Sequence, residues 1–168
     1  MRDAPLTIRI RTTADSAATA SRELLPMKKI IHTVHIHSMP SEVFEALTTE
    51  KGVTGWWTTE AKLEPGEGNL IKFRFMDVFS PRMRQVRLEK ESLVEWKCEG
   101  GHDNWQDNTF TFELREKDGE TSLKFVQIYA QELDDDTYGT YNFNWGYYLG
   151  SLKKLCEEGK GTPFEAHS

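Results

Sequence analysis

The sequence predicts an α+β protein in which a long C-terminal helix covers the concave side of a curved antiparallel sheet. Two observations lead to this fold class. The final part of the chain repeats large apolar side chains at three- and four-residue spacing, the pattern of one helical face. The part before it alternates apolar and polar residues in short runs, the pattern of half-buried strands. A helix that follows a series of hairpins buries its apolar face against the sheet, and such a closure often leaves a pocket.

The first structured segment predicts a strand followed by two short helices. Residues 28–37 alternate apolar with polar side chains, which is typical of a strand. Pro40 suits the first turn of a helix whose cap is Ser38 or Ser41. An apolar stripe supports this helix and consists of Val43, Phe44 and Leu47. A second, irregular helix is expected over residues 50–57.

Six further strands are expected between the short helices and the C-terminal helix. Turn-forming clusters separate them, and the sharpest hairpin signal is Asp118-Gly119. Apolar and polar residues alternate on both sides of that pair, so one face of the sheet should be buried and the other wet. The expected strands span residues 59–63, 68–78, 83–90, 93–99, 108–116 and 120–130.

The C-terminal helix carries its apolar residues on one face, which consists of Tyr141, Trp145, Tyr148, Leu149, Leu152 and Leu155. Asp134-Asp135-Asp136 comes just before it, where negative charge favours the positive end of the helix dipole. A cation site is the alternative interpretation of these aspartates. Gly159-Lys160-Gly161 is expected to end the helix.

Residues 27–160 are predicted to form one domain, because no repeat or linker divides them and the length of 168 residues suits a single core. Residues 1–26 are expected to be a disordered leader, rich in Thr, Ala and Ser. A transit peptide is the alternative, although three acidic residues accompany the four arginines of this stretch. Met27, which begins the first strongly structured stretch, is a candidate translation start. Residues 161–168 are expected to be a loose tail.

Composition excludes several classes of partner. The formal net charge is −6 and a basic stripe is missing, so we expect no nucleic acid. No apolar run reaches about 18 residues, so we expect no stable membrane insertion. Cys98 and Cys156 are too few for a disulfide framework, and the expected location is the cytoplasm. Cys-x-x-Cys and His-x-x-x-His spacings are absent, so we expect no metal and no cofactor.

Several separated motifs occur in an order that resembles a known family. The stretch PSEVFEALT at residues 40–48 follows the first strand, and Trp56-Trp57 closes the helical pair. Further along the chain come Gly68, Phe73, Phe75 and Trp96, and then the stretch from Trp145 to Lys153. Over residues 28–159 the chain resembles the SRPBCC superfamily, also called START-like or birch-pollen-allergen-like. Within it, the chain is most similar to the family named after the C-terminal domain of the heat-shock-protein-90 ATPase activator.

This resemblance implies a helix-grip fold, with two small helices filling one end of the sheet. It implies little about chemistry, because the superfamily includes ligand carriers, cyclases, hydrolase-like members and chaperone partners. Many relatives carry a histidine near the position of Gln127. Glutamine keeps the hydrogen bonding but does not titrate near neutral pH, which weakens an acid–base role at this position.

No residue stands out as a catalyst. His35 and His37 share one face of the first strand, beside His32, and could ligate a metal if an acidic residue joined them. The alternative is that they decorate an exposed strand face. His102 and His167 have no partner visible in the sequence. The cysteines have no visible catalytic partner either: Cys98 alternates with apolar neighbours and is expected to pack inward, and Cys156 follows Leu155 on the terminal helix.

Aromatic residues are the strongest functional signal, because they occur on every element that should face a cavity. A solid core built from the same residues is the alternative. The polar groups expected to orient a ligand are Gln127, Arg74, Asn142 and Asn144. Trp105, in a polar loop, is expected to be exposed at a pocket mouth or a partner contact. The candidate ligand-binding residues are Trp56, Trp57, Phe73, Phe75, Trp96, Phe110, Phe112, Phe125, Gln127, Tyr129, Asn142, Trp145 and Leu149.

These observations favour noncatalytic binding of a small hydrophobic or aromatic molecule in a cavity between the sheet and the C-terminal helix. An enzyme of the cyclase or hydrolase-like kind is one alternative, and an inward-pointing Arg74 or histidine would favour it. A chaperone-associated interaction module is the other alternative. The chain is expected to be a monomer or a homodimer.

Overall fold

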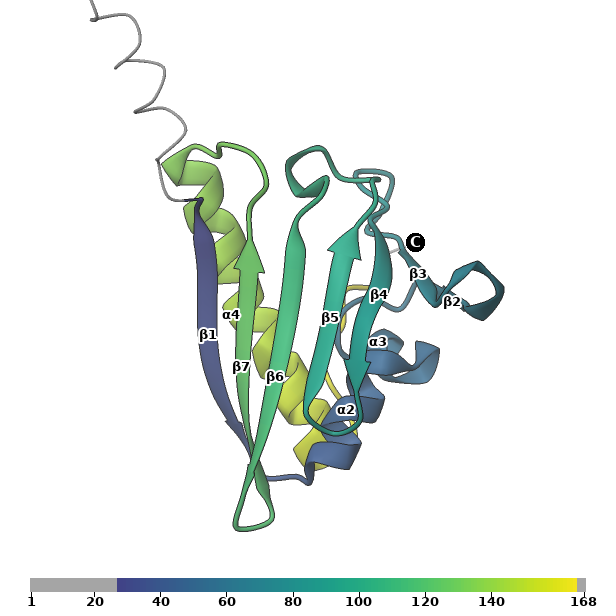
Figure 1. The fold of residues 1–168 in the computed structure, drawn as a ribbon, viewed down its shortest axis with the longest axis vertical. Coiled ribbons are helices and arrows are strands. Elements are labelled where there is room, and N and C mark those ends of the chain that lie inside the picture. The colour runs from purple at the N-terminus through teal and green to yellow at the C-terminus, as the bar shows by residue number, and fades with distance from the viewer. Residues whose placement is uncertain (1–26, 166–168) are drawn as a thin grey trace, which may run out of the picture.

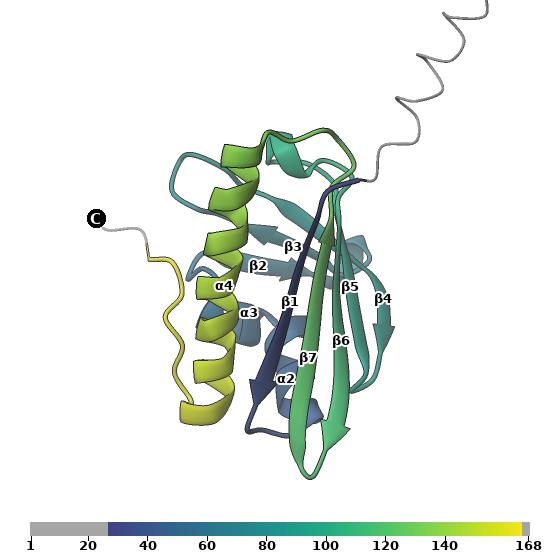
Figure 2. The ribbon, with the colours of Figure 1, turned by 90° about the vertical axis from the view of Figure 1, so that its left-hand side faces the viewer.

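Seven strands form one antiparallel sheet in the order β1-β7-β6-β5-β4-β3-β2, and α4 lies across one of its faces (Figures 1 and 2). The computed structural model describes residues 27–165, so the predicted leader lies outside the described residues. The elements are β1 (Lys29–Ile36), α2 (Pro40–Thr48), α3 (Glu50–Trp56), β2 (Ala61–Glu64), the 3-10 helix η1 (Pro65–Glu67), β3 (Leu70–Phe73), β4 (Arg82–Glu89), β5 (Leu93–Cys98), the 3-10 helix η2 (Asp103–Trp105), β6 (Thr109–Lys117), β7 (Glu120–Ile128) and α4 (Asp135–Glu158). The predicted α+β helix-grip class is confirmed.

The alternation of the central strands places their large side chains beneath α4. β6 and β7 pair from Thr109 opposite Ile128 to Lys117 opposite Glu120, around the predicted turn. Positive φ angles at Asp118 and Gly119 produce that turn, which suits the twist of the flanking strands. The inward side chains of these strands are fully or almost fully buried, and they include Val94, Trp96, Cys98, Phe110, Phe112, Leu114, Leu123 and Phe125.

α4 closes the concave face of the sheet with its apolar stripe. Trp145, Leu149 and Leu152 are buried, as their spacing predicts. The Asp134 carboxylate caps the helix by accepting a hydrogen bond of 2.8 Å from the Thr137 N–H. Gly159 ends the helix in the left-handed conformation, with φ of 78°. At the start of α2 the N-cap residue is Met39 and no side chain caps the helix, so neither predicted serine has that role.

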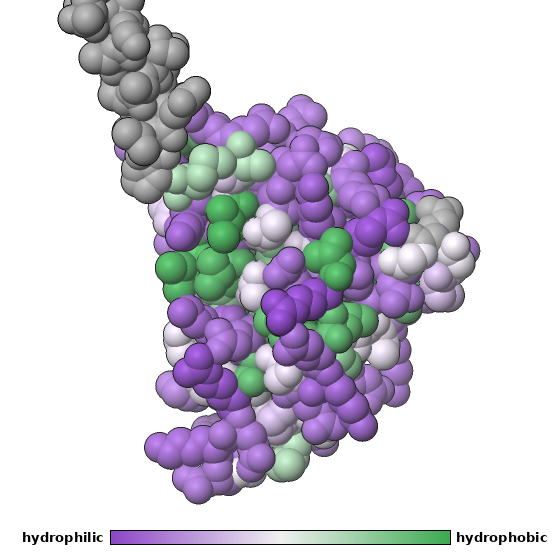
Figure 3. Space-filling model, viewed as in Figure 1, coloured by the Kyte–Doolittle hydropathy of each residue, from purple (hydrophilic) through white to green (hydrophobic). Residues whose placement is uncertain are grey.

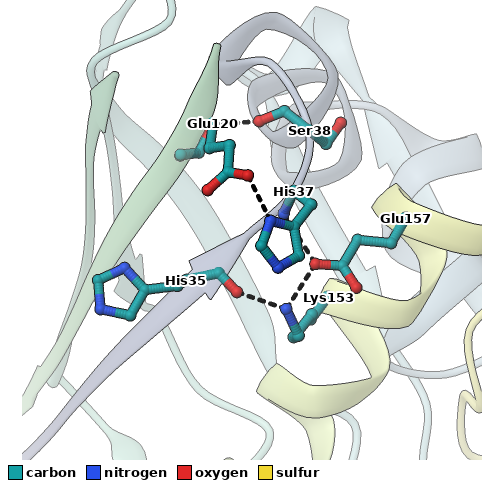
Figure 4. A network of polar contacts seen from close by, with 7 residues as sticks. His35, His37, Ser38, Glu120, Lys153 and Glu157 are labelled. Carbon is teal, nitrogen blue, oxygen red and sulfur yellow. Dashed lines mark hydrogen bonds and ion pairs between the residues drawn. The ribbon is translucent and has the colours of Figure 1, made fainter. Parts of the chain in front are cut away.

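Polar contacts fasten the end of α4 to the end of β1 (Figure 4). The Lys153 ammonium donates to the backbone carbonyl of His35 at 2.6 Å and pairs with Glu157 at 2.5 Å. Glu157 also accepts the His37 N–H at 2.7 Å, and the His37 ring contacts Glu120. His35 and His37 are exposed. Within residues 27–165 no three potential metal-ligating side chains gather.

The β3–β4 loop and the C-terminal segment differ from their predicted form, and both lie at the same end of the molecule. The strand expected over residues 68–78 ends at Phe73, because the chain turns at Met76 and the Phe75 N–H donates to the Phe79 carbonyl at 2.9 Å. The tail expected to be loose is docked as far as Phe164. Its N–H donates to the Trp57 carbonyl at 2.8 Å.

The opposite face of the sheet is mostly hydrophilic, with separate hydrophobic side chains among the polar ones (Figure 3). Exposed apolar residues of the strands include Ile31, Val86 and Leu88. Single apolar side chains on a surface are ordinary and mark no site. In the described part of the chain, no helix has both the length and the apolar character needed to cross a membrane.

Candidate functional site

An apolar pocket of about 220 Å³ opens between α4 and the loops at one end of the sheet. Five separate segments build it: α4, the end of α3, the β3–β4 loop, the β5–β6 loop and the C-terminal segment. Figure 2 shows the β3–β4 loop beside the first half of α4. The lining residues are Trp57, Phe75, Met76, Val78, Phe79, His102, Trp105, Tyr141, Asn144, Trp145, Tyr148 and Phe164.

Three tryptophans from three different elements form the floor of the pocket. The ring centroids of Trp57 and Trp145 are 5.2 Å apart, and those of Trp57 and Trp105 are 6.1 Å apart. Trp105 and Trp145 are separated by 6.2 Å, and the three interplanar angles lie between 21° and 30°. The nearly parallel rings stack on one another, and their remaining exposed parts, at most 7% of each residue, form an apolar floor. A buried amide fixes one of them, because the Trp145 indole N–H donates to the Gln127 side-chain oxygen at 2.8 Å.

The rim of the pocket is apolar and partly open to solvent. Phe75 packs against Phe164 with ring centroids 5.7 Å apart, so the C-terminal segment completes the wall. Met76 and Val78 on the β3–β4 loop are 52% and 68% exposed, and Phe79 is 37% exposed. These side chains surround the opening without filling it.

His102 is the buried polar side chain of the pocket. It is 7% exposed, and its ring stacks on Trp105 with centroids 4.2 Å apart and planes 5° apart. Phe79 lies 4.7 Å from the same ring. Neither ring nitrogen has a hydrogen-bond partner. Burial lowers the pKa of His102 to about 4, against a smaller opposing effect of Asp103, so the imidazole is neutral at neutral pH.

A glycine allows the two loops of the pocket to approach each other. Gly101 has φ of +81°, and a Cβ placed there would lie 1.8 Å from the Ser80 carbonyl oxygen. The Ser80 N–H donates to the Gly101 carbonyl at 2.9 Å, which joins the β3–β4 loop to the β5–β6 loop. Gly101 therefore fixes the path of the β5–β6 loop, and the position of the His102 ring depends on that path.

Behind the floor, a cluster of buried aromatic and aliphatic side chains packs between the sheet and α4. Tyr129 is fully buried, and burial raises the pKa of its hydroxyl, outweighing the opposite effect of the neighbouring Trp105 and Gln127 side chains. The other predicted site residues belong to the same core cluster, and these are Trp56, Phe73, Trp96, Phe110, Phe112, Phe125 and Leu149. The pocket lies at the end of this core rather than inside it.

The predicted site residues therefore form two groups, those at the pocket and those in the core. Trp57, Phe75 and Trp145 line the pocket. Gln127 supports its floor from behind. Asn142 is absent from the lining, and Asn144, two positions along α4, lies there instead.

Arg74 is also outside the pocket. Its side chain is 56% exposed and pairs with Asp77 at 2.6 Å on the β3–β4 loop. It does not supply a cation to the cavity, because the loop turns it toward its acidic neighbours.

The main pocket-lining residues that are missing from the sequence-based candidates lie on loops. Trp105 was expected to be exposed, yet it is only 7% exposed. The glycine pair at residues 100–101 is the signal that could have found it, since positive φ angles there fold the loop back over the sheet end. His102 follows that pair directly.

Residues 37–157 match the family described as "Activator of Hsp90 ATPase homolog 1-like protein". No curated protein matches the chain at a significant level. Among solved structures, the Aha1 dimer from Colwellia psychrerythraea is similar, with 28% identity, 80% of this chain and 100% of that chain covered, and a TM-score of 0.69. Protein SSP2350 from Staphylococcus saprophyticus is similar at 20% identity, with 83% and 98% covered and a TM-score of 0.63. Protein MLL2253 from Mesorhizobium loti is similar at 16% identity, with 76% and 96% covered and a TM-score of 0.66.

Proposed function

The chain belongs to the family of Activator of Hsp90 ATPase homolog 1-like proteins, and we propose that it is a noncatalytic protein that binds a small, largely apolar molecule. The observation that carries this proposal is the pocket of about 220 Å³, whose wall is aromatic or aliphatic except for His102 and Asn144. Pockets of this kind bind mainly by removing apolar surface from water, with a few polar groups fixing orientation.

The expected affinity follows from the area that a ligand can bury. An aromatic group the size of a large aromatic side chain buries roughly 200 Å². At about 25 cal/mol per Å², this burial contributes about 5 kcal/mol before the cost of association. That cost reduces the net gain, so burial of one such group alone gives dissociation constants of about 0.2 mM or weaker, and a ligand that survives purification must add further burial or hydrogen bonds.

The enzyme alternative depends on His102, because it is the histidine that lines the pocket. A general base works best when its pKa lies near the working pH. The lowered pKa of about 4 makes this imidazole a weak base. Among the described residues, no carboxylate lines the pocket to orient the ring. Both observations favour binding over catalysis.

Native mass spectrometry of freshly purified protein, compared with its denatured mass, tests the proposal. We expect an extra mass that is released on denaturation. An Asn144→Trp variant should lose that mass, because the indole would occupy the opening. A Phe143→Trp variant is the matched control, since Phe143 is 77% exposed and does not line the pocket. A clean apo mass would contradict the proposal if 2-methylnaphthalene also left the tryptophan indole NMR signals unchanged.

Protein binding through the outer face of α4 is a second candidate function. Phe143 and Tyr147 lie one turn apart on this helix and are 77% and 55% exposed. The similar Colwellia protein is described as a dimer, which makes a homodimer the first contact to test. Sedimentation velocity of the wild type and of a Phe143→Ser, Tyr147→Ser variant would detect it. Addition of an Hsp90-class chaperone tests the chaperone alternative in the same experiment.

Both candidate functions fit the expected cytoplasmic location. Cys98 and Cys156 are free thiols, as is usual for proteins of a reducing compartment. Burial raises the pKa of the Cys156 thiol to about 12, so it is not a reactive thiolate at neutral pH.

A further inference from the structure

We propose that the ligand is an uncharged, planar aromatic molecule bearing a hydroxyl or carbonyl group, and that His102 is the residue that recognises this group. This inference rests on the proposed binding function and adds the chemical class of the ligand. Three features of the pocket support it: the shape of its floor, the lack of charge in its wall, and the unsatisfied nitrogens of one buried ring.

The floor favours a flat ring system. Trp57, Trp105 and Trp145 are stacked with their planes within 30° of one another, so a flat ring that enters the pocket can continue this stack. Aromatic rings prefer offset stacking or edge-to-face contact with such surfaces. A cavity of about 150 Å³ is enough to bind benzene in other proteins. The 220 Å³ here therefore suits one substituted ring or two fused rings.

The wall favours a ligand without charge. No Lys, Arg, Asp or Glu side chain lines the pocket within residues 27–165. Arg74 lies on the adjoining loop, but it pairs with Asp77 at 2.6 Å. A carboxylate placed in the pocket would lose its hydration without gaining a cationic partner, which costs several kilocalories per mole or more. A fatty acid or aromatic acid is therefore a poor ligand.

His102 supplies the recognition of a polar group. Its ring lines the pocket and is 7% exposed, and both of its nitrogens lack partners. A buried polar atom without a hydrogen bond is costly, so a ligand that supplies one gains affinity. The neutral imidazole offers one donor and one acceptor, which suit a hydroxyl or a carbonyl. Both nitrogens are buried in the present orientation of the ring. A half-turn about the Cβ–Cγ bond exchanges them with the ring carbons and keeps the stack on Trp105, so we expect a ligand to select the turned ring.

Other polar groups of the pocket are less suited to this role. The buried Trp105 indole N–H also lacks a partner, but it can only donate. The Tyr141 hydroxyl already accepts a hydrogen bond of 2.8 Å from the Asn104 amide. Asn144 is exposed at the rim, where water competes for its amide. Hydrogen bonds that form away from water discriminate between ligands more strongly. His102 is therefore the expected determinant of specificity.

The experiment compares three probes of one shape: 2-naphthol, 2-methylnaphthalene and 2-naphthoate. Their binding is followed through the tryptophan indole N–H signals in ¹H–¹⁵N NMR titrations. We expect the wild type to bind 2-naphthol about tenfold more tightly than 2-methylnaphthalene, the effect of one buried hydrogen bond. We expect 2-naphthoate to bind most weakly. In His102→Phe, affinity for 2-naphthol should fall to that for 2-methylnaphthalene, which should itself be unchanged. His35→Phe, on the exposed face of β1, is the control.

The outcomes separate the inference from the function on which it rests. If all three probes bind the wild type equally, or if His102→Phe keeps the preference for 2-naphthol, the pocket binds ligands but the assigned class is wrong. If no probe moves an indole signal, the binding function fails as well. One measurement needs no variant: the His102 ring ¹⁵N shifts of the wild type should change on addition of 2-naphthol, and unchanged shifts would overturn the role of His102.

Discussion

His102 should make the protein lose stability as the pH falls through a defined window, and replacing it with Phe should remove that loss. In the unfolded chain the imidazole has its ordinary pKa of 6.5, whereas burial lowers the pKa of the folded state to about 4. Between these values the unfolded state binds the proton and the folded state does not. The free energy of unfolding therefore decreases as the pH falls from about 6.5 to about 4, and this contribution is constant above that window.

The magnitude follows from the two pKa values. One pKa unit corresponds to about 1.4 kcal/mol, so the full shift is worth at most about 3 kcal/mol. At pH 5 the folded ring is still mostly neutral and the unfolded ring mostly charged. Between pH 7.5 and pH 5 we therefore expect the wild type to lose about 2 kcal/mol more than His102→Phe. His102 is 7% exposed, so solvent screening does not reduce this figure greatly.

Urea unfolding at a series of pH values measures this difference. Carboxylates such as Glu99 and Glu157 also have lowered pKa values, because Arg84 and Lys153 hydrogen-bond to them, and they destabilise the fold in acid. Their effect is common to both proteins and cancels in the comparison. Parallel stability profiles of wild type and His102→Phe between pH 7.5 and pH 5 would refute the reasoning. They would mean that the ring is hydrated or paired in the folded protein.

Three further substitutions test parts of the fold that shape the site, each by urea unfolding. Gly101→Ala should destabilise the protein by about 2 kcal/mol or more, because its methyl group would meet the Ser80 carbonyl and its φ is +81°; a loss below 0.5 kcal/mol would contradict this close approach. Ser151→Ala should cost about 1–3 kcal/mol, since the buried hydroxyl donates to the Trp56 carbonyl at 2.8 Å; a neutral result would mean that water replaces it. Asp134→Ala should cost about 1 kcal/mol by removing the cap of α4, and an unchanged stability would exclude that role.

The fold was predictable because its long strands and its C-terminal helix carry periodic signals in the sequence. Alternation in β6 and β7 shows which side chains face α4, and Asp118-Gly119 shows where the hairpin turns. The stripe containing Trp145 and Leu149 gives the buried face of α4. These are local patterns, and the register of a sheet follows from them once one face must be buried.

The site was only partly predictable, because loops form most of its wall. Phe75 and Val78 read as the continuation of a strand, although the chain turns between them at Met76. Trp105 sits in a polar loop, and only the contacts made after folding bury it. Periodicity carries no information about where a loop folds back. The residues found in advance, such as Trp145, are those that also belong to the core.

Residues that belong to both the core and the pocket limit how the pocket can change during evolution. Trp57 and Trp145 belong to both the core and the pocket floor, so a substitution there that changes the ligand preference also lowers the stability of the fold. Met76, Val78 and Asn144 contact the pocket while remaining exposed, so they can vary at little thermodynamic cost. Descendants of this scaffold can therefore acquire new ligands by rim mutations alone. A directed-evolution library confined to these three positions would sample ligand preference while retaining most of its folded members.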